Sequence, residues 1–209
     1  MRTKLIASAI LLLTQMAVPA LAADQWEIDS RHSQASFSIR HMMVSNVRGT
    51  ISSIKGSANY DGKNVKELNV NAEMDVNSIN TADADRDKHL KGPDFFDVAK
   101  YPTITFKSDK VVQDANGKFK LVGDLTMHGV TKKVELAVDG PTSIIKDPHG
   151  KERVGASATT RVNRQDFGIK YNSALDGGGL ALGNDVDITL DIEMTKQKAA
   201  SEPTTKKSS

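Results

Sequence analysis

The 209-residue chain contains no cysteine, and aromatic residues make up only 5% of it. Without cysteine there are no disulfides, no thiol ligands for a metal, no thiol nucleophile and no redox pair. Stability must therefore come from a buried core and from backbone pairing, and the chain is long enough to form one core. The scarcity of aromatic residues also means that bulky side chains are few where a tightly filled interior would need them.

The sequence also lacks the common motifs of hydrolytic and metal-dependent enzymes. Its five histidines are not spaced as metal ligands, and neither H-E-x-x-H nor G-x-S-x-G occurs. The acidic run at 83–87 resembles a calcium loop, but Lys88 stands where the turn needs glycine and Asp94 where the loop needs glutamate. The glycine run at 177–179 predicts a flexible loop, not a phosphate site. We therefore expect no catalytic residue, no metal and no cofactor, although three histidines could still meet in space.

The N-terminal segment has the pattern of a secretory signal peptide. Two basic residues precede a mostly apolar run from Leu5 to Val18, and Ala20-Leu21-Ala22 has the small-x-small pattern of a cleavage site. The apolar run is too short to span a bilayer, and no later stretch is apolar enough to do so. We expect residues 1–22 to be removed and the mature protein to be exported to a Gram-negative periplasm without a stable membrane anchor. Whether secretion continues beyond the periplasm stays open.

Removal of this segment would leave a neutral chain. Residues 1–22 contain two of the 28 basic residues and none of the 26 acidic ones, so the two signs then balance. A neutral chain without interleaved basic and aromatic residues gives no support for nucleic acid as a partner. Residues 196–209 are mostly alanine, serine, threonine and lysine with nothing to bury, and we expect a disordered tail.

Alternation of apolar and polar residues dominates the remaining chain. It is clearest at 68–76 and 186–194, where an apolar side chain occupies every second position. After Ser52-Ser53 the alternation changes phase, which predicts a β-bulge or a bend. Turn-forming sequences such as Asn116-Gly117 separate these stretches. The pattern predicts half-buried antiparallel strands, about eight or nine in number. Helix is expected only at roughly Ala82–Leu90 and in a single turn near Asn163.

We therefore predict an all-β protein: an extended, antiparallel, eight-stranded β-barrel with a short helix in one connection. Closure is favoured over a sandwich because it removes exposed sheet edges. A barrel of this size holds either its own side chains or one slim ligand. Many inward positions are small, which predicts a long apolar cavity but is equally compatible with tight packing between strands. These positions are Ala35, Gly49, Gly56, Ala58, Ala72, Gly123, Ala156 and Ala158.

One connection concentrates charged and aromatic residues. It runs from Arg86-Asp87-Lys88-His89 through Phe95-Phe96 to a strand that contains Phe106. Such a cluster in a connection of a regular scaffold is where we expect the mouth of a binding site. Structural alternatives remain: the paired phenylalanines as core plugs, and Arg86 with Asp87 as a salt bridge that pins the loop.

Several stretches, in order along nearly all of the mature chain, resemble the YceI-like family of exported lipid-binding proteins. Among them are Val44-Ser45-Asn46-Val47-Arg48-Gly49, Leu125-Thr126-Met127-His128-Gly129-Val130 and Asn163-Arg164-Gln165-Asp166-Phe167-Gly168. The resemblance implies one domain at 23–195, a lipocalin-like barrel whose interior holds an isoprenoid or similar long-chain fatty amphiphile. It also implies transport or sequestration of that ligand and a role in the stress response.

Given this resemblance, we select residues expected to contact the ligand. Arg86, Asp87 and His89 would meet the polar head group at the mouth, and the others would line the throat and the interior. The ligand-binding set is Phe37, Ile39, Arg86, His89, Phe95, Phe96, Phe106, Ala156, Ala158 and Phe167. The expected mechanism is sequestration, in which each buried methylene group contributes roughly 0.8 kcal/mol.

A second hypothesis, from a different class, is an exported metal-dependent hydrolase that acts on an amphiphile. Solvent extraction followed by mass spectrometry would separate the two, because a carrier retains a long-chain lipid and a metalloenzyme retains zinc. The sequence does not identify the lipid, its donor or its acceptor. It also does not decide between a monomer and a homodimer.

Overall fold

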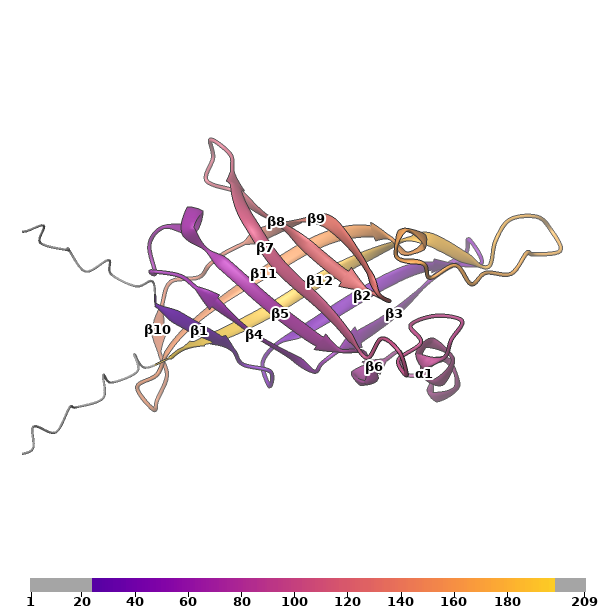
Figure 1. Cartoon of the computed structure of the whole chain (residues 1–209), viewed down its shortest axis with the longest axis horizontal. Coiled ribbons are helices and arrows are strands. Elements are labelled where there is room, and N and C mark those ends of the chain that lie inside the picture. The colour runs from indigo at the N-terminus through magenta and orange to yellow at the C-terminus, as the bar shows by residue number, and fades with distance from the viewer. Residues whose placement is uncertain (1–23, 198–209) are drawn as a thin grey trace, which may run out of the picture.

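The computed structural model describes residues 24–197, and β-strands dominate this range (Figure 1). The expected signal peptide and most of the expected tail lie outside the described residues, so both stay predictions. The α-helix α1 (Ala84–Lys91) lies in the connection between β6 (Ile79–Asn80) and β7 (Thr103–Gln113). Among residues 24–197, no helix has the length and apolar character needed to cross a bilayer.

The remaining elements are short turns of 3-10 helix and strands of very different length. The 3-10 turns are η1 (Val65–Glu67), η2 (Val76–Ser78) and η3 (Arg164–Phe167). The other strands are β1 (Gln25–Ile28), β2 (Gln34–His41), β3 (Ser45–Ile51), β4 (Ile54–Asn59), β5 (Asn69–Asp75), β8 (Phe119–Met127), β9 (Val130–Asp139), β10 (Ile145–Lys146), β11 (Glu152–Asn163) and β12 (Leu182–Lys196).

These strands pair into a closed antiparallel barrel. Three of the eight barrel strands are interrupted, so that each consists of two labelled segments: β1 with β2, β3 with β4, and β5 with β6. The other five are β7, β8, β9, β11 and β12. Because β12 pairs with β1 and β2 on one edge and with β11 on the other, the sheet closes on itself. The predicted eight-stranded barrel with one short helix is confirmed.

The change of phase expected at Ser52-Ser53 is the break between β3 and β4. Its backbone groups find other partners, because Ser53 N–H donates to Ser78 Oγ at 3.0 Å and Ser53 O accepts from Asp75 N–H at 2.9 Å. The interrupted strands therefore bend without leaving these groups unpaired.

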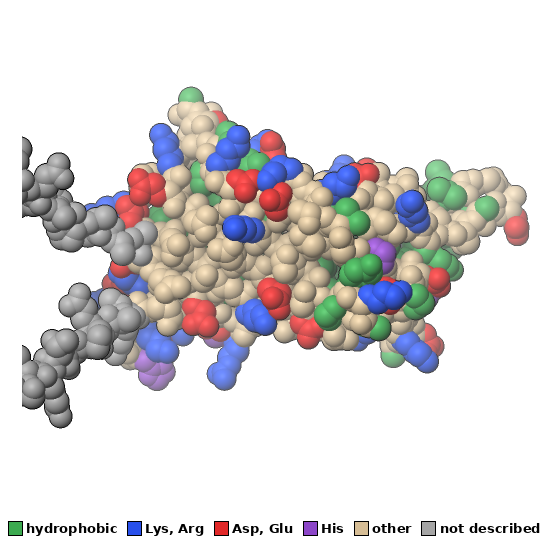
Figure 2. Space-filling model, in the orientation of Figure 1, with side chains coloured by type: hydrophobic (Ala, Val, Ile, Leu, Met, Phe, Trp, Pro, Cys, Tyr) green, Lys and Arg blue, Asp and Glu red, His purple; other side chains and the backbone are tan. Residues whose placement is uncertain are grey.

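Alternation along each strand separates an apolar inner face from a polar outer face. Side chains of lysine, arginine, aspartate and glutamate are distributed over the outer surface (Figure 2). The inner faces of β7 and β8 supply buried residues, including Ile104, Phe106, Leu121 and Leu125. Burial of this apolar area is the main stabilising contribution to the barrel.

The barrel end beside β10 is filled by large side chains. Trp26 has no exposed surface, and its indole Nε1 donates to Tyr60 O at 2.9 Å. Phe119, Val154 and Met194 are buried at the same end, where β1, β8, β11 and β12 meet. The opposite end carries α1, η3, the β2–β3 turn and the long connection from η3 to β12 (Figure 1). The connection predicted from the sequence to form the mouth of a binding site lies at that opposite end.

Candidate ligand-binding site

The inner face of β12 is only partly covered. Val186, Ile188 and Leu190 alternate with exposed polar residues, and each is half-buried although β11 and β2 pair with both edges of the strand. The inner residues of β7 and β8 are buried by comparison. Since the neighbouring strands already cover the edges of β12, its remaining exposure indicates unfilled apolar space inside the barrel.

Two predicted ligand contacts lie beside this space. Phe37 of β2 is opposite Ile188 in the strand pairing, and Ile39 is opposite Val186. Both are half-buried, and Phe37 packs against the core. The structure therefore brings these two predicted residues together with the partly covered face of β12.

Some small inward residues do not create empty space. A Cβ at Gly49 would lie 2.4 Å from the Phe37 ring, and a Cβ at Gly123 would lie 2.7 Å from the Phe106 ring. At Gly56, with φ +158°, it would lie 2.2 Å from a backbone oxygen of β5. These three glycines permit close packing of rings and strands. Of the two interpretations of the small inward residues, tight packing is therefore confirmed at these positions and a cavity is wrong.

The other predicted interior residues are spread along the barrel. Phe106 is buried on β7, and Ala158 is 9% exposed on β11 between Val138 of β9 and Leu190 of β12 in the strand pairing. Ala156 lies one step nearer the filled end, opposite Ile192. The predicted contacts thus follow the length of the barrel and do not form one compact pocket.

Arg86 and Asp87 hold the start of α1 against β6. Asp87 Oδ1 accepts from Thr81 N–H at 2.8 Å and from Thr81 Oγ1 at 2.6 Å. Arg86 Nε donates to Thr81 Oγ1 at 2.8 Å and Arg86 Nη2 to Thr81 O at 2.7 Å, while Arg86 Nη1 lies 3.6 Å from Asp83 Oδ2. Asp83 also caps the helix, accepting from Arg86 N–H at 3.0 Å. Both residues therefore pin the loop, but the predicted salt bridge between Arg86 and Asp87 is wrong: among residues 24–197, Arg86 pairs with Asp83, and Asp87 accepts from Thr81.

The other predicted mouth residues join the α1 connection to the loop after η3. His89 Nε2 lies 2.9 Å from Asp94 Oδ2. The rings of His89, Phe95 and Tyr171 pack edge-on or tilted, with centroids 4.9–5.0 Å apart. Phe95 is buried, and Phe96 is half-buried against the core. This three-ring cluster includes Tyr171, which the sequence analysis missed because nothing near it in the chain marks a contact with α1.

Phe167 is fixed by the short turn η3. Asn163 caps the turn through its side chain, and Gly168 ends it with φ +81° in the left-handed region that favours glycine. Phe167 is 2% exposed, and its carbonyl lies 3.1 Å from His128 Nδ1, which must therefore carry the proton. The turn therefore holds Phe167 buried at the mouth end, beside the gap between β9 and β11.

Arg164 is a buried residue whose role the sequence analysis did not assign. It is 3% exposed and donates to Gly183 O at 2.9 Å and to Ile169 O and Tyr171 O at 2.8 Å. Burial lowers the pKa of its guanidinium. These three carbonyls come from β12 and from the segment after η3, so Arg164 ties the mouth loop to the barrel wall.

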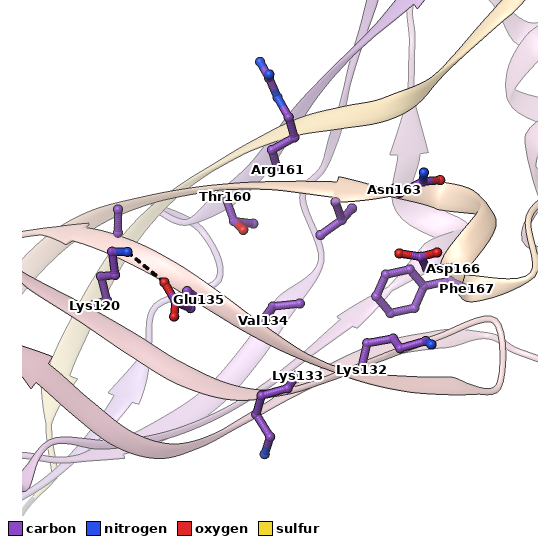
Figure 3. A pocket seen from close by; sticks show the side chains of 12 residues that line it. Lys120, Lys132, Lys133, Val134, Glu135, Thr160, Arg161, Asn163, Asp166 and Phe167 are labelled. Atoms are coloured by element: carbon purple, nitrogen blue, oxygen red, sulfur yellow. Dashed lines mark hydrogen bonds and ion pairs between the residues drawn. The ribbon is translucent and has the colours of Figure 1, made fainter.

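A groove lies where β9 and β11 separate (Figure 3). The two strands pair only between Ala137–Asp139 and Ser157–Thr159, and beyond that point a cavity of about 490 Å³ opens. Val134, Val162 and Phe167 give it apolar surface, and four cationic side chains with one glutamate and one aspartate surround it. Its lining contains neither histidine nor serine and so offers no histidine-activated serine nucleophile.

Within residues 24–197, one group could hold a metal ion: Asp29, His32 and Glu193, whose ligand atoms lie within 4.8 Å of one another. However, Arg153 Nη1 lies 2.8 Å from Asp29 Oδ2 and also pairs with Glu193. The Arg153 guanidinium is the main cause of a pKa of Asp29 well below its usual range. The Arg153 guanidinium already pairs with both carboxylates that a metal ion would need, which does not favour the metal-dependent hydrolase.

A closed antiparallel barrel of eight strands, with large side chains at one end and a half-buried apolar row on the inner face of β12, belongs to a class of barrels wide enough to hold one slim ligand. The model of the YceI-like domain matches residues 26–194, and the chain belongs to this family. It is 35% identical over 199 residues to a UPF0312 protein of Vibrio parahaemolyticus, covering 94% of this chain and all of the relative. The predicted family is confirmed.

Solved structures share the fold. The Campylobacter jejuni YCEI protein is 28% identical, with a TM-score of 0.64, and the match covers 77% of this chain and 91% of that protein. A domain from Saccharophagus degradans described as polyisoprenoid-binding has a TM-score of 0.57 at 13% identity, covering 82% of this chain and 98% of that domain. At that identity the second match shows the fold alone.

Proposed function

We propose that this protein binds a polyisoprenoid or similar long-chain amphiphile inside the barrel and acts as a carrier, not as an enzyme. The observation that carries the proposal is the half-buried inner row of β12 at 186–190, beside Phe37 and Ile39. A flexible hydrocarbon tail placed there would cover apolar surface that the strands leave uncovered. The polyisoprenoid-binding description of the Saccharophagus degradans domain supports the same class of ligand.

The two barrel ends give the ligand a direction. Trp26 and its neighbours fill one end, so the tail would enter from the end of α1 and η3. The head group would then lie near Arg86 and His89, which stand at that mouth and keep partly exposed side chains. Few oriented polar groups at the mouth of an apolar site are typical of ligand-binding cavities.

We further propose that the protein works in the periplasm after cleavage of its signal peptide. The support is the basic start, the apolar run and Ala20-Leu21-Ala22. A carrier is useful in such a compartment because a free long-chain lipid is nearly insoluble in water.

Solvent extraction of the purified protein followed by mass spectrometry tests the carrier function directly. We expect a long-chain lipid in near-stoichiometric amount. Bound zinc without lipid would instead support the hydrolase and overturn the proposal.

A pair of variants locates the ligand. Val186→Trp fills the half-buried inner face of β12, whereas Thr189→Trp places the same ring on the exposed outer face of that strand. We expect the first variant to lose most bound lipid and the second to retain it, with the β-sheet circular dichroism unchanged in both. Equal lipid content in the two variants would show that the ligand does not lie against this wall.

A further inference from the structure

An exposed apolar surface lies at the mouth end of the barrel. Met42, Met43 and Val44 in the β2–β3 turn are 45%, 66% and 78% exposed, and Leu180 in the loop before β12 is 47% exposed. We call these four residues the apolar tip. Apolar side chains gather over this end of the molecule in Figure 2. Contiguous exposed apolar residues of this kind mark interaction sites.

The two segments of the apolar tip form one surface. Met42 N–H donates to Ala181 O at 2.7 Å. A Cβ at Gly179 would lie 3.0 Å from Met43 Sδ, so the methionine side chain rests on the glycine-rich loop. The turn and the loop, far apart in the sequence, are thus held side by side and project together.

The backbone geometry of the β2–β3 turn does not favour the methionine side chains that it carries. Val44 N–H donates to His41 O at 3.1 Å, and the two central residues, Met42 and Met43, have φ angles of 47° and 60°. A turn with two positive φ angles favours asparagine and glycine, and large side chains there are strained. Two methionines in these positions weaken the turn and expose apolar surface. This indicates that they contribute to binding and not to the stability of the fold.

The two chain segments that form the apolar tip carry a small excess of positive charge. Residues 40–48 contain two arginines and no acidic residue, and residues 168–182 contain one lysine and one aspartate. Arg40 Nη2 donates to Met43 O at 2.7 Å, which fixes a cation at the base of the turn. A second copy docked by twofold symmetry would bring these cations together, whereas an anionic surface complements them.

We propose that the apolar tip docks reversibly onto an anionic phospholipid bilayer, with its apolar side chains among the acyl chains and its basic residues at the head groups. This combination of apolar insertion and cationic contact is how peripheral proteins bind membrane surfaces. The proposal rests on the proposed carrier function for its purpose, because the tip stands at the end where the lipid tail would enter. Docking there would let a lipid pass between membrane and barrel without crossing water.

Flotation with vesicles tests docking, using the processed protein that starts after the signal peptide. We expect binding to vesicles of phosphatidylcholine and phosphatidylglycerol, weaker binding to phosphatidylcholine alone, and loss at high salt. Met43→Ser with Val44→Ser should lower the partition coefficient at least about tenfold, from the apolar groups withheld from the bilayer. Ile145→Ser is the matched control, because Ile145 is 61% exposed on β10 at the other end and should not affect binding.

Two outcomes overturn the proposal. One is vesicle binding that is equal in the parent protein and the double variant. The other is a dimer, detected by sedimentation equilibrium without lipid, that the double variant dissociates while vesicle binding is unchanged, because the tip would then bind a second copy. Titration of a prenyl alcohol without vesicles separates this test from the carrier function. The double variant should bind the alcohol like the parent, and failure of the parent to bind it would refute the carrier without affecting docking.

Discussion

Two identical glycine substitutions in the barrel should have opposite effects on stability. Gly123→Ala adds a Cβ that would lie 2.4 Å from Lys107 O and 2.8 Å from Ser108 Cα, both backbone atoms of β7. Gly155→Ala adds a Cβ whose nearest neighbour, Ile192 O, is 3.6 Å away, an ordinary contact. Both residues lie in strands and neither has a positive φ. The environment of the added methyl group is therefore the main difference.

The expected magnitudes follow from those distances. β7 has an irregular register opposite Gly123, between Ser108 and Lys110, so its backbone is already displaced there. Overpacking of this kind costs about 1–3 kcal/mol of unfolding free energy. Gly155→Ala should instead raise the free energy of unfolding by about 0.4–1 kcal/mol, because alanine restricts the unfolded chain.

Urea unfolding followed by circular dichroism measures both changes. The midpoints should move in opposite directions with an unchanged slope, since the surface exposed on unfolding is the same. If Gly123→Ala proved neutral, the close approach of β7 to β8 would be wrong. If both variants lost stability equally, strand glycines would act through propensity alone and the packing argument would fail.

Three further changes test the interior, the charges at the filled end and the mouth. Ala158→Phe should lower lipid binding and also cost about 1–3 kcal/mol of stability by overpacking, measured by urea unfolding. Because Arg153 depresses the pKa of Asp29, the stabilisation from this pair is complete above the unfolded carboxyl pKa of about 4 and is lost as the pH falls through the lower folded value. Arg153→Gln should therefore reduce the acid-side slope of melting temperature against pH; an unchanged slope would refute this linkage. Arg86→Ala should lower the melting temperature, because Thr81 loses the two hydrogen bonds that Arg86 donates to it. The same variant should weaken binding of a prenyl pyrophosphate more than binding of a prenyl alcohol; equal losses in calorimetric titrations would leave Arg86 as a loop clamp only.

Period-two alternation was enough to predict half-buried antiparallel strands, because inner and outer faces follow directly from strand geometry. The choice of a barrel over a sandwich needed the further argument that closure removes exposed sheet edges. The interruption at Ser52-Ser53 was also visible, as a change of phase between apolar positions. The helix was expected in the correct connection, where Asp83 and Gly92 occupy the cap positions at its two ends. Each of these features depends on residues that are close together in the sequence, so a local sequence pattern is enough to predict it.

Contacts between distant segments could not be predicted in the same way. Tyr171 meets His89 and Phe95 only because the loop after η3 folds back over α1. Whether an inward glycine leaves a cavity depends on the ring across the barrel, as Gly49 and Phe37 show. Sequence alone gives the size of one side chain and not the position of its neighbour.

The asymmetry of the barrel connects these observations. Trp26 and the charges around Arg153 lie at the β10 end, where large side chains fill the interior and ion pairs hold the strands together outside. The other end has mouth loops held by hydrogen bonds from Arg164 and Arg86, and an apolar tip that the fold itself does not use. Large buried side chains thus close the β10 end, whereas loops cover the mouth end. The proposed carrier function fits this division, because an end that opens for the ligand cannot also be the most tightly packed part of the barrel.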